Sequence, residues 1–221
     1  MVTALPIPMD EAAVTLAQWV SPGFPVGAFA YSHGLERAIH EGRVTDAEGL
    51  HDWLADLLTH GAGRTDAVLV RCAHAAADTD EVLHIDASAR AFAGTAERLT
   101  ETRLQGAALA RTISAVWPFD LPDLVYPVAL GRAAALAELP GDLTVVMSLH
   151  AFVANLTSAA VRLVPLGQTQ GQAVLAGLAP LCHRVAAETR GAGLNDLAGQ
   201  AFLSDIMAMR HETQETRLFR T

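Results

Sequence analysis

The segment from residue 142 to residue 164 restricts the fold more than any other stretch of the chain. Its apolar residues recur every three or four positions, as they do on one face of an α-helix. At about 1.5 Å per residue, such a helix is long enough to cross a bilayer. However, His150, Asn155 and Arg162 interrupt it, and no second apolar segment of similar length accompanies it. We therefore interpret it as the buried central helix of a helical protein and not as a membrane span.

The rest of the chain also favours helices. Hydrophobic residues make up 51% of the sequence but aromatic residues only 5%, so alanine, leucine and valine must form the core. Apolar stripes with helical spacing recur through the sequence, and no alternating stretch indicates a strand. We predict an all-α fold, a single-domain bundle of about ten helices with a flexible C-terminal tail. Residues 1–193 would form the core, and residues 194–221 a C-terminal helix and tail that a partner orders.

Charge and composition exclude several functions. The net charge of −9 and the absence of a basic stretch argue against nucleic-acid binding. The chain has no lysine, so it lacks a Walker-type phosphate loop and cannot form a Schiff base. Cys72 and Cys182 are far apart, and we expect free thiols. The N-terminus has no signal-peptide pattern, which predicts a cytoplasmic protein without a membrane segment.

Metal-dependent catalysis is the alternative that the histidines leave open. Four pairs of one histidine and one carboxylate have the spacing that places both side chains on one helix face: Glu36/His40, Asp56/His60, His74/Asp78 and His211/Glu215. The chain has neither H-E-x-x-H nor C-x-x-C, so no pair extends to a recognisable ligand set. A helical enzyme using these pairs remains the second hypothesis. Glu97 and Glu101 could serve as paired carboxylates, but we expect them on a solvated helix face.

A proline- and glycine-rich turn at residues 21–32, S-P-G-F-P-V-G-A-F-A-Y-S, is the first candidate site. Two prolines fix the backbone there, and two glycines permit conformations that other residues resist. Large apolar side chains in such a loop are costly unless something covers them. We assign to a contact surface for another protein the residues Pro22, Phe24, Pro25, Gly27, Phe29, Tyr31 and Ser32.

Two further features suggest binding to another protein. Arg162 lies near the end of the strongest predicted helix, where it forms either a structural ion pair or a docking group. The run from residue 210 to residue 221 is charged except for one apolar pair, and it has nothing to fold on by itself. We expect it to become ordered on a partner. Its candidate contact residues are Arg210, His211, Arg217, Leu218 and Phe219.

Five stretches, in order along the chain, resemble the family of the urease accessory protein UreF. They are the turn and following helix at 21–36, E-T-R-L-Q-G at 101–106, Y-P-V-A-L-G at 126–131, A-A-V-R-L-V-P-L-G-Q-T-Q-G-Q at 159–172 and M-R-H-E-T-Q-E-T-R-L-F-R at 209–220. Two departures are small. Gly27–Ala28 stands where many members carry a glycine pair, and Thr221 stands where many end in serine.

The resemblance implies an all-helical, homodimeric chaperone that is not an enzyme. It implies a scaffold that joins a second accessory protein, UreD (also called UreH), through the C-terminal segment and recruits the GTPase UreG. The resemblance further implies that the complex delivers nickel to apo-urease as GTP is hydrolysed, and that the scaffold has a modulating role toward that GTPase. On this view the chain holds no cofactor of its own, because nickel is handled by the complex and GTP is bound by UreG. The turn would face UreG or the second protomer.

Overall fold

The computed structural model describes residues 9–197 and 201–220, and every regular element within these ranges is helical. The α-helices are α1 (Met9–Trp19), α2 (Leu35–His40), α3 (Ala47–Thr59), α4 (Ala62–Ala75), α5 (Thr79–Ala91), α6 (Ala96–Val116), α7 (Tyr126–Leu136), α8 (Gly141–Leu163), α9 (Gln168–Glu188) and α10 (Phe202–His211). Two short 3₁₀-helices, η1 (Ala28–Ala30) and η2 (Leu194–Asp196), lie between them. The all-α prediction is confirmed.

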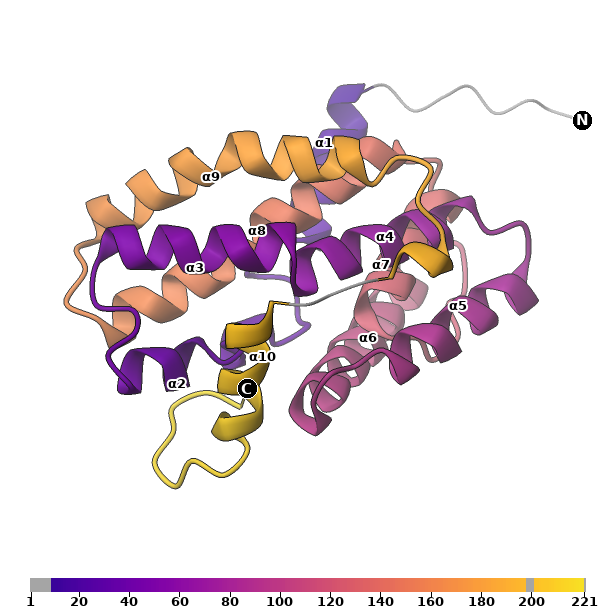
Figure 1. The fold of residues 1–221 in the computed structure, drawn as a ribbon. Helices are drawn as coiled ribbons and strands as arrows, with labels where there is room; N and C mark the ends of the chain where they lie inside the picture. Colours follow the sequence, from indigo (N-terminus) through magenta and orange to yellow (C-terminus); the bar gives the residue numbers. More distant parts are fainter. Residues whose placement is uncertain (1–8, 198–200, 221) are drawn as a thin grey trace, which may run out of the picture.

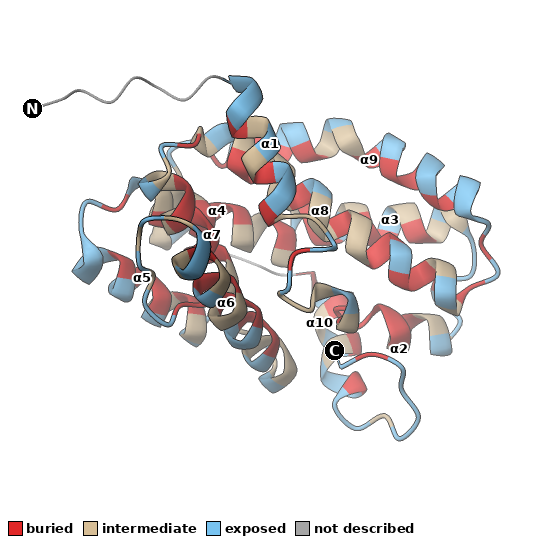
Figure 2. Cartoon of the chain, turned by 180° about the vertical axis from the view of Figure 1, so that it is seen from behind, coloured by how far each residue is buried: buried red, intermediate tan, exposed pale blue. Residues whose placement is uncertain are grey.

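Helix α8 forms the centre of the bundle, as its apolar stripe predicted. It packs against α9 on one side and α4 on another, and α4 in turn packs against α7 (Figure 1). Leu149, Val153 and Leu156 are buried at these contacts, and buried residues line the inner faces of the surrounding helices (Figure 2). Within the described ranges, α8 is the one helix long and apolar enough to cross a membrane. Of its most apolar stretch, 44% is buried within the bundle, where α8 packs against α4 and α9.

Side-chain caps fix where three helices begin. Asp46, Asp78 and Thr95 each accept a hydrogen bond from a backbone N–H three residues later, at 2.9, 2.9 and 3.0 Å. Each such cap satisfies a donor that the first turn leaves unpaired and contributes about 1 kcal/mol. The spacing of Thr45 and Glu48 predicts a capping box at the start of α3, but this prediction is wrong by one residue, because Asp46 is the cap.

Two helices, α2 and α9, differ from what the sequence pattern predicts. The spacing of Tyr31, Leu35 and Ile39 predicts a helix from residue 31, but α2 begins at Leu35 because His33 (φ 52°) and Gly34 (φ 74°) are left-handed. At Gly34, a Cβ would lie 2.6 Å from the backbone nitrogen of Ala208, so the close approach of α10 to the start of α2 requires a residue without a side chain here. A proline inside a helical pattern predicts a kink or a new helix at Pro180, yet α9 runs continuously through it. Packing of α9 against α3 and α8 offsets the lost hydrogen bond.

Candidate functional site

The proline- and glycine-rich turn folds around one buried aromatic residue. Phe24 enters the hydrophobic core, and its N–H donates to the Ser21 carbonyl at 2.9 Å. Gly27 (φ 75°) then redirects the chain into η1. Because of this change in direction, Phe29 projects outward and is 62% exposed. The turn is thus fixed to the core by Phe24, while the aromatic side chain of Phe29 is exposed to solvent.

Residues 212–220, which we call the tail, lie against the end of this turn and the start of α2. The N–H groups of Leu218 and Phe219 donate to the two oxygens of Glu36 at 2.7 and 2.9 Å, and the Arg220 N–H donates to the Ala30 carbonyl at 2.8 Å. Phe219 is buried, whereas Leu218 is 76% exposed. The expectation that this run has nothing to fold on is therefore corrected, because the Glu36 carboxylate supplies acceptors for its backbone.

Arg162 joins the turn to the tail. Its guanidinium donates to the Ser158 carbonyl at 3.1 Å and, at 3.5 Å, to the carbonyl of Phe29. The Cζ atom lies 4.9 Å from the centre of the Phe219 ring, within the range of a cation–π contact. Among the described residues no carboxylate pairs with it, so the ion-pair alternative does not apply. We call Phe29, Arg162, Leu218 and Phe219 the junction.

Burial divides the residues that the sequence assigned to a contact surface. Five of them lie beneath the surface and support it: Phe24, Tyr31, Ser32, His211 and Phe219. Seven are exposed: Pro22, Pro25, Phe29, Arg162, Arg210, Arg217 and Leu218. Gly27 is half-buried. Arg210 points away from the junction, because its guanidinium pairs with Glu41 at 3.1 and 3.2 Å.

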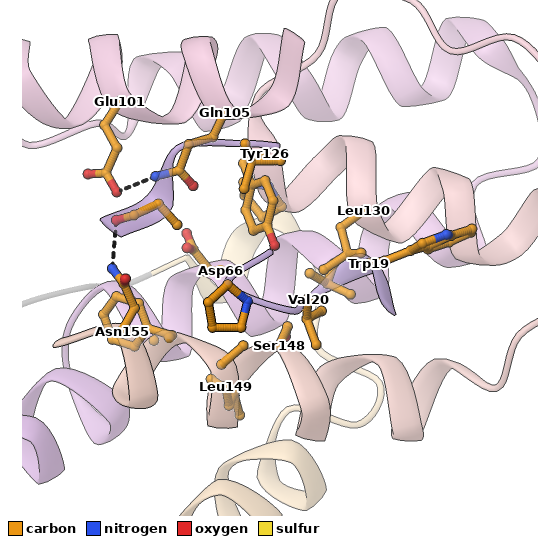
Figure 3. A pocket seen from close by; sticks show the side chains of 18 of the residues that line it. Trp19, Val20, Asp66, Glu101, Gln105, Tyr126, Leu130, Ser148, Leu149 and Asn155 are labelled. Carbon is orange, nitrogen blue, oxygen red and sulfur yellow. Dashed lines mark hydrogen bonds between the residues drawn. The ribbon is translucent and has the colours of Figure 1, made fainter. Parts of the chain in front are cut away.

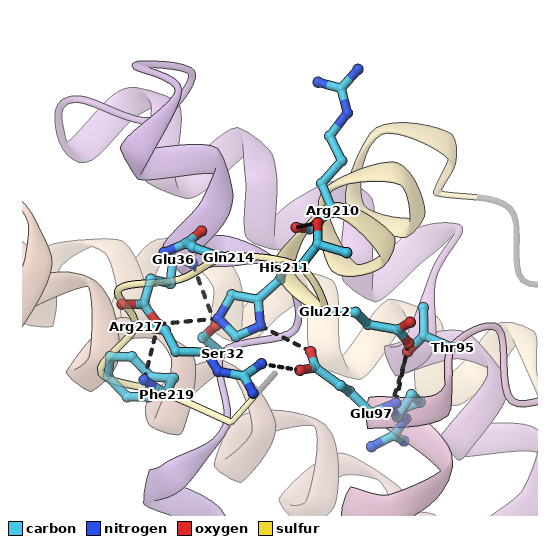
Figure 4. Close-up of polar contacts among 12 residues, drawn as sticks. Ser32, Glu36, Thr95, Glu97, Arg210, His211, Glu212, Gln214, Arg217 and Phe219 are labelled. Carbon is cyan, nitrogen blue, oxygen red and sulfur yellow. Dashed lines mark hydrogen bonds and ion pairs between the residues drawn. The ribbon is translucent and has the colours of Figure 1, made fainter.

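His211 links the tail to two helices (Figure 4). Its ring nitrogens lie 2.9 Å from a Glu97 oxygen and 3.2 Å from a Glu36 oxygen, and the side chain has no exposed surface. Arg217 pairs with the other Glu97 oxygen. Helical spacing paired Glu36 with His40 and His211 with Glu215. In the structure Glu36 and His211 instead contact each other, across 175 residues of sequence.

A partly buried cluster of charges contacts His33, the residue that directly follows the turn. Arg98 pairs with Asp66 at 2.6 Å and with Glu101 at 3.3 Å, and the other Glu101 oxygen lies 3.0 Å from the His33 ring. Glu101 is only 2% exposed, so its expected place on a solvated face is wrong. Burial alone would raise the pKa of Glu101, but His33 and Arg98 together hold it below its ordinary value.

The cluster borders a pocket of about 80 Å³ behind the turn. Asp66, Glu101 and Tyr126 lie at one end of it and Trp19 and Leu130 at the other (Figure 3). Burial raises the pKa of Tyr126 to about 12, and the charge of Asp66 adds to this effect. Helical periodicity did not indicate Arg98, nor that Glu101 is a buried partner of Arg98 and His33. The available signal was the lack of one clean apolar stripe on α6.

No metal site emerges from the histidine–carboxylate pairs. The described part of the chain contains no group of three histidine, cysteine or carboxylate side chains that could hold a metal ion. His74 is engaged instead with the Leu139 carbonyl at 2.8 Å, and Glu36 with His211 and the tail. Cys72 and Cys182 are free, and burial raises the pKa of the Cys182 thiol to about 11.

A family model and three similar curated relatives all carry the same name, UreF. A family model described as UreF matches residues 44–179. The chain is 56% identical over 211 residues to the urease accessory protein UreF of Roseobacter denitrificans, covering 96% of this chain and 95% of the relative. Identity to the proteins of the same name is 51% in Ruegeria pomeroyi, covering 97% and 99%, and 55% in Cereibacter sphaeroides strain KD131, covering 96% and 100%. These relatives are named as accessory proteins and not as enzymes.

Proposed function

Because this chain belongs to the UreF family of urease accessory proteins, with a non-catalytic role in urease maturation, we propose that it is a cytoplasmic scaffold for nickel insertion. It forms a homodimer, binds the accessory protein UreD (UreH) and recruits the GTPase UreG to apo-urease. Nickel passes through this complex, and UreG binds the GTP and supplies the nucleotide chemistry. The absence of lysine supports that division, since this chain has no phosphate loop.

The junction is the observation that carries the proposal. Phe29 and Leu218 expose large apolar side chains on segments that are otherwise anchored by hydrogen bonds and buried neighbours. A rigid apolar side chain on a fixed backbone loses little conformational entropy on binding, which favours its use at an interface. Arg162 and Arg217 lie beside them and suit the polar rim of such a contact. We assign Phe29 to the side that meets UreG or the second protomer, and Arg217 and Leu218 to the side that meets UreD.

The first prediction concerns these two side chains. Phe29→Ser and Leu218→Ser should each weaken capture of the partner by at least about tenfold, because each removes an apolar side chain that the partner would cover. Thermal unfolding should change little, since both side chains are exposed in the free chain. The measurement is a titrated pull-down of purified UreD and UreG, with and without GTP.

Val14→Ser is the matched control, because Val14 is comparably exposed on α1, outside the junction. It should bind both partners as the unaltered chain does. Equal binding by all three variants would show that the junction is not the docking surface. A loss with Val14→Ser as large as that with Phe29→Ser would point to a general loss of solubility.

A further inference from the structure

The 3₁₀-helix η1, which carries Phe29, has few hydrogen bonds of its own. The Ala30 N–H donates to the Gly27 carbonyl at 3.2 Å, and the Tyr31 N–H donates to the Ala28 carbonyl at 3.3 Å. A single 3₁₀ turn with two bonds of this length does not hold its shape alone, because the entropy cost of ordering its backbone exceeds what such bonds contribute. Groups outside the turn must therefore fix the direction in which Phe29 projects.

Asn155 supplies the shortest of three hydrogen bonds that reach η1 from other segments. Its Nδ2 atom donates to the Ala28 carbonyl at 2.7 Å (Figure 3). The Arg162 guanidinium reaches the carbonyl of Phe29 at 3.5 Å, and the N–H of Arg220 in the tail reaches the carbonyl that follows it at 2.8 Å. Arg162 and Arg220 are exposed, whereas Asn155 is half-buried, so water competes least with the bond from Asn155.

We propose that Asn155 is a positioning residue, which holds the turn so that Phe29 faces a protein partner. Its bond to the Ala28 carbonyl orients the planar peptide unit between Ala28 and Phe29, and with it the direction of the Phe29 side chain. Asn155 lies within α8, which packs against η1, α4 and α9, so the turn is held by the most firmly packed helix of the bundle. Phe29 is a docking side chain of the proposed function, on which this inference rests.

Hydrogen exchange in the free, full-length chain tests the positioning without any partner. Asn155→Leu keeps a branched side chain of similar size but has no donor for the Ala28 carbonyl. We expect the protection factors of the Ala30 and Tyr31 amides to fall at least about tenfold, because a half-buried acceptor loses its closest donor. The amide of Ile113 in the core should keep its protection, which shows that the bundle itself remains folded.

Ser148→Ala is the matched control, since Ser148 precedes Asn155 by about two turns of the same helix and lines the same pocket behind the turn. Its hydroxyl donates to the Val145 carbonyl of its own helix at 2.8 Å and not to the turn. This variant should leave the protection of the Ala30 and Tyr31 amides unchanged. The positioning role is overturned if Asn155→Leu also leaves them unchanged, or if Ser148→Ala lowers them as much.

A double-mutant cycle then separates positioning from a general structural effect. Asn155→Leu should weaken capture of the partner that Phe29→Ser weakens by at least about threefold, since a smaller fraction of chains presents Phe29 correctly. Adding Asn155→Leu to Phe29→Ser should weaken capture no further, because Asn155 acts through Phe29. Losses that add would overturn the proposal. If Phe29→Ser bound both partners normally, the docking role of Phe29 would fail, and the exchange measurement would still decide whether Asn155 holds the turn.

Discussion

Gly106→Ala should lower the free energy of unfolding by about 3 kcal/mol. A Cβ at this position would lie 2.0 Å from the carbonyl oxygen of Leu124, 2.7 Å from the carbonyl carbon of Val125 and 2.8 Å from the nitrogen of Tyr126. These are backbone atoms that cannot rotate aside, so α6 must move away from the start of α7. That movement would also stretch the hydrogen bond from the Tyr126 N–H to Thr102, which is 3.3 Å long. Urea unfolding followed by circular dichroism gives the free energy directly.

Gly94→Ala is the control for this substitution. A Cβ at Gly94 meets nothing within 4 Å, and its φ is not positive, so we expect a change within about 0.5 kcal/mol. Gly131→Ala should behave like Gly106→Ala, since its Cβ would lie 2.3 Å from the Val70 carbonyl where α7 crosses α4. If Gly106→Ala cost no more than Gly94→Ala, the close approach of α6 and α7 would be wrong.

The two glycines mark what one sequence can and cannot predict. The recurring apolar spacing predicts helices in both segments, because such spacing is a local property of the sequence. Within that pattern Gly106 and Gly131 read only as weak helix positions. Each glycine allows the backbone of another segment to approach closely, and which segment lies there is determined by tertiary packing and not by local sequence. Gly106 and Gly131 are the last residues of two stretches, 101–106 and 126–131, on which the resemblance to the UreF family is based.

The junction shows the same division. The sequence identified the turn, Arg162 and the tail as separate features with a shared binding character. It did not predict that they meet, because the contacts of Glu36 with Phe219 and of Arg162 with Phe29 span more than a hundred residues. It also assigned Glu36 to a local pair with His40, since helical spacing reveals only neighbours on one face. In the structure the Glu36 carboxylate instead accepts hydrogen bonds from the backbone of the tail.

Arg98→Met should cost about 3–5 kcal/mol in the free energy of unfolding at neutral pH. The substitution preserves most of the side-chain volume but leaves Asp66 and Glu101 without their shared cation. Glu101 is almost fully buried, so water cannot replace the lost partner, and only His33 and the side-chain amide of Gln105, which donates to Glu101 at 2.9 Å, remain beside its charge. Because His33 follows the turn directly, the variant should also loosen the backbone that presents Phe29. Arg103→Met, an exposed position on the same helix, should change stability by less than about 0.5 kcal/mol.

The pH dependence of this variant tests the electrostatic cause. In the unaltered chain the pKa of Glu101 lies below its ordinary value, so its stabilising contribution is present at neutral pH and is lost only as the solution becomes acidic through that pKa. Without Arg98, only His33 opposes the effect of burial, which raises the pKa of Glu101. The pKa of Glu101 should therefore be higher in the variant than in the unaltered chain. Glu101 can then take up a proton at a higher pH, which relieves the buried charge. The stability deficit of Arg98→Met should therefore shrink between about pH 7 and about pH 5. A deficit that stayed constant over this range would assign the loss to packing instead of charge.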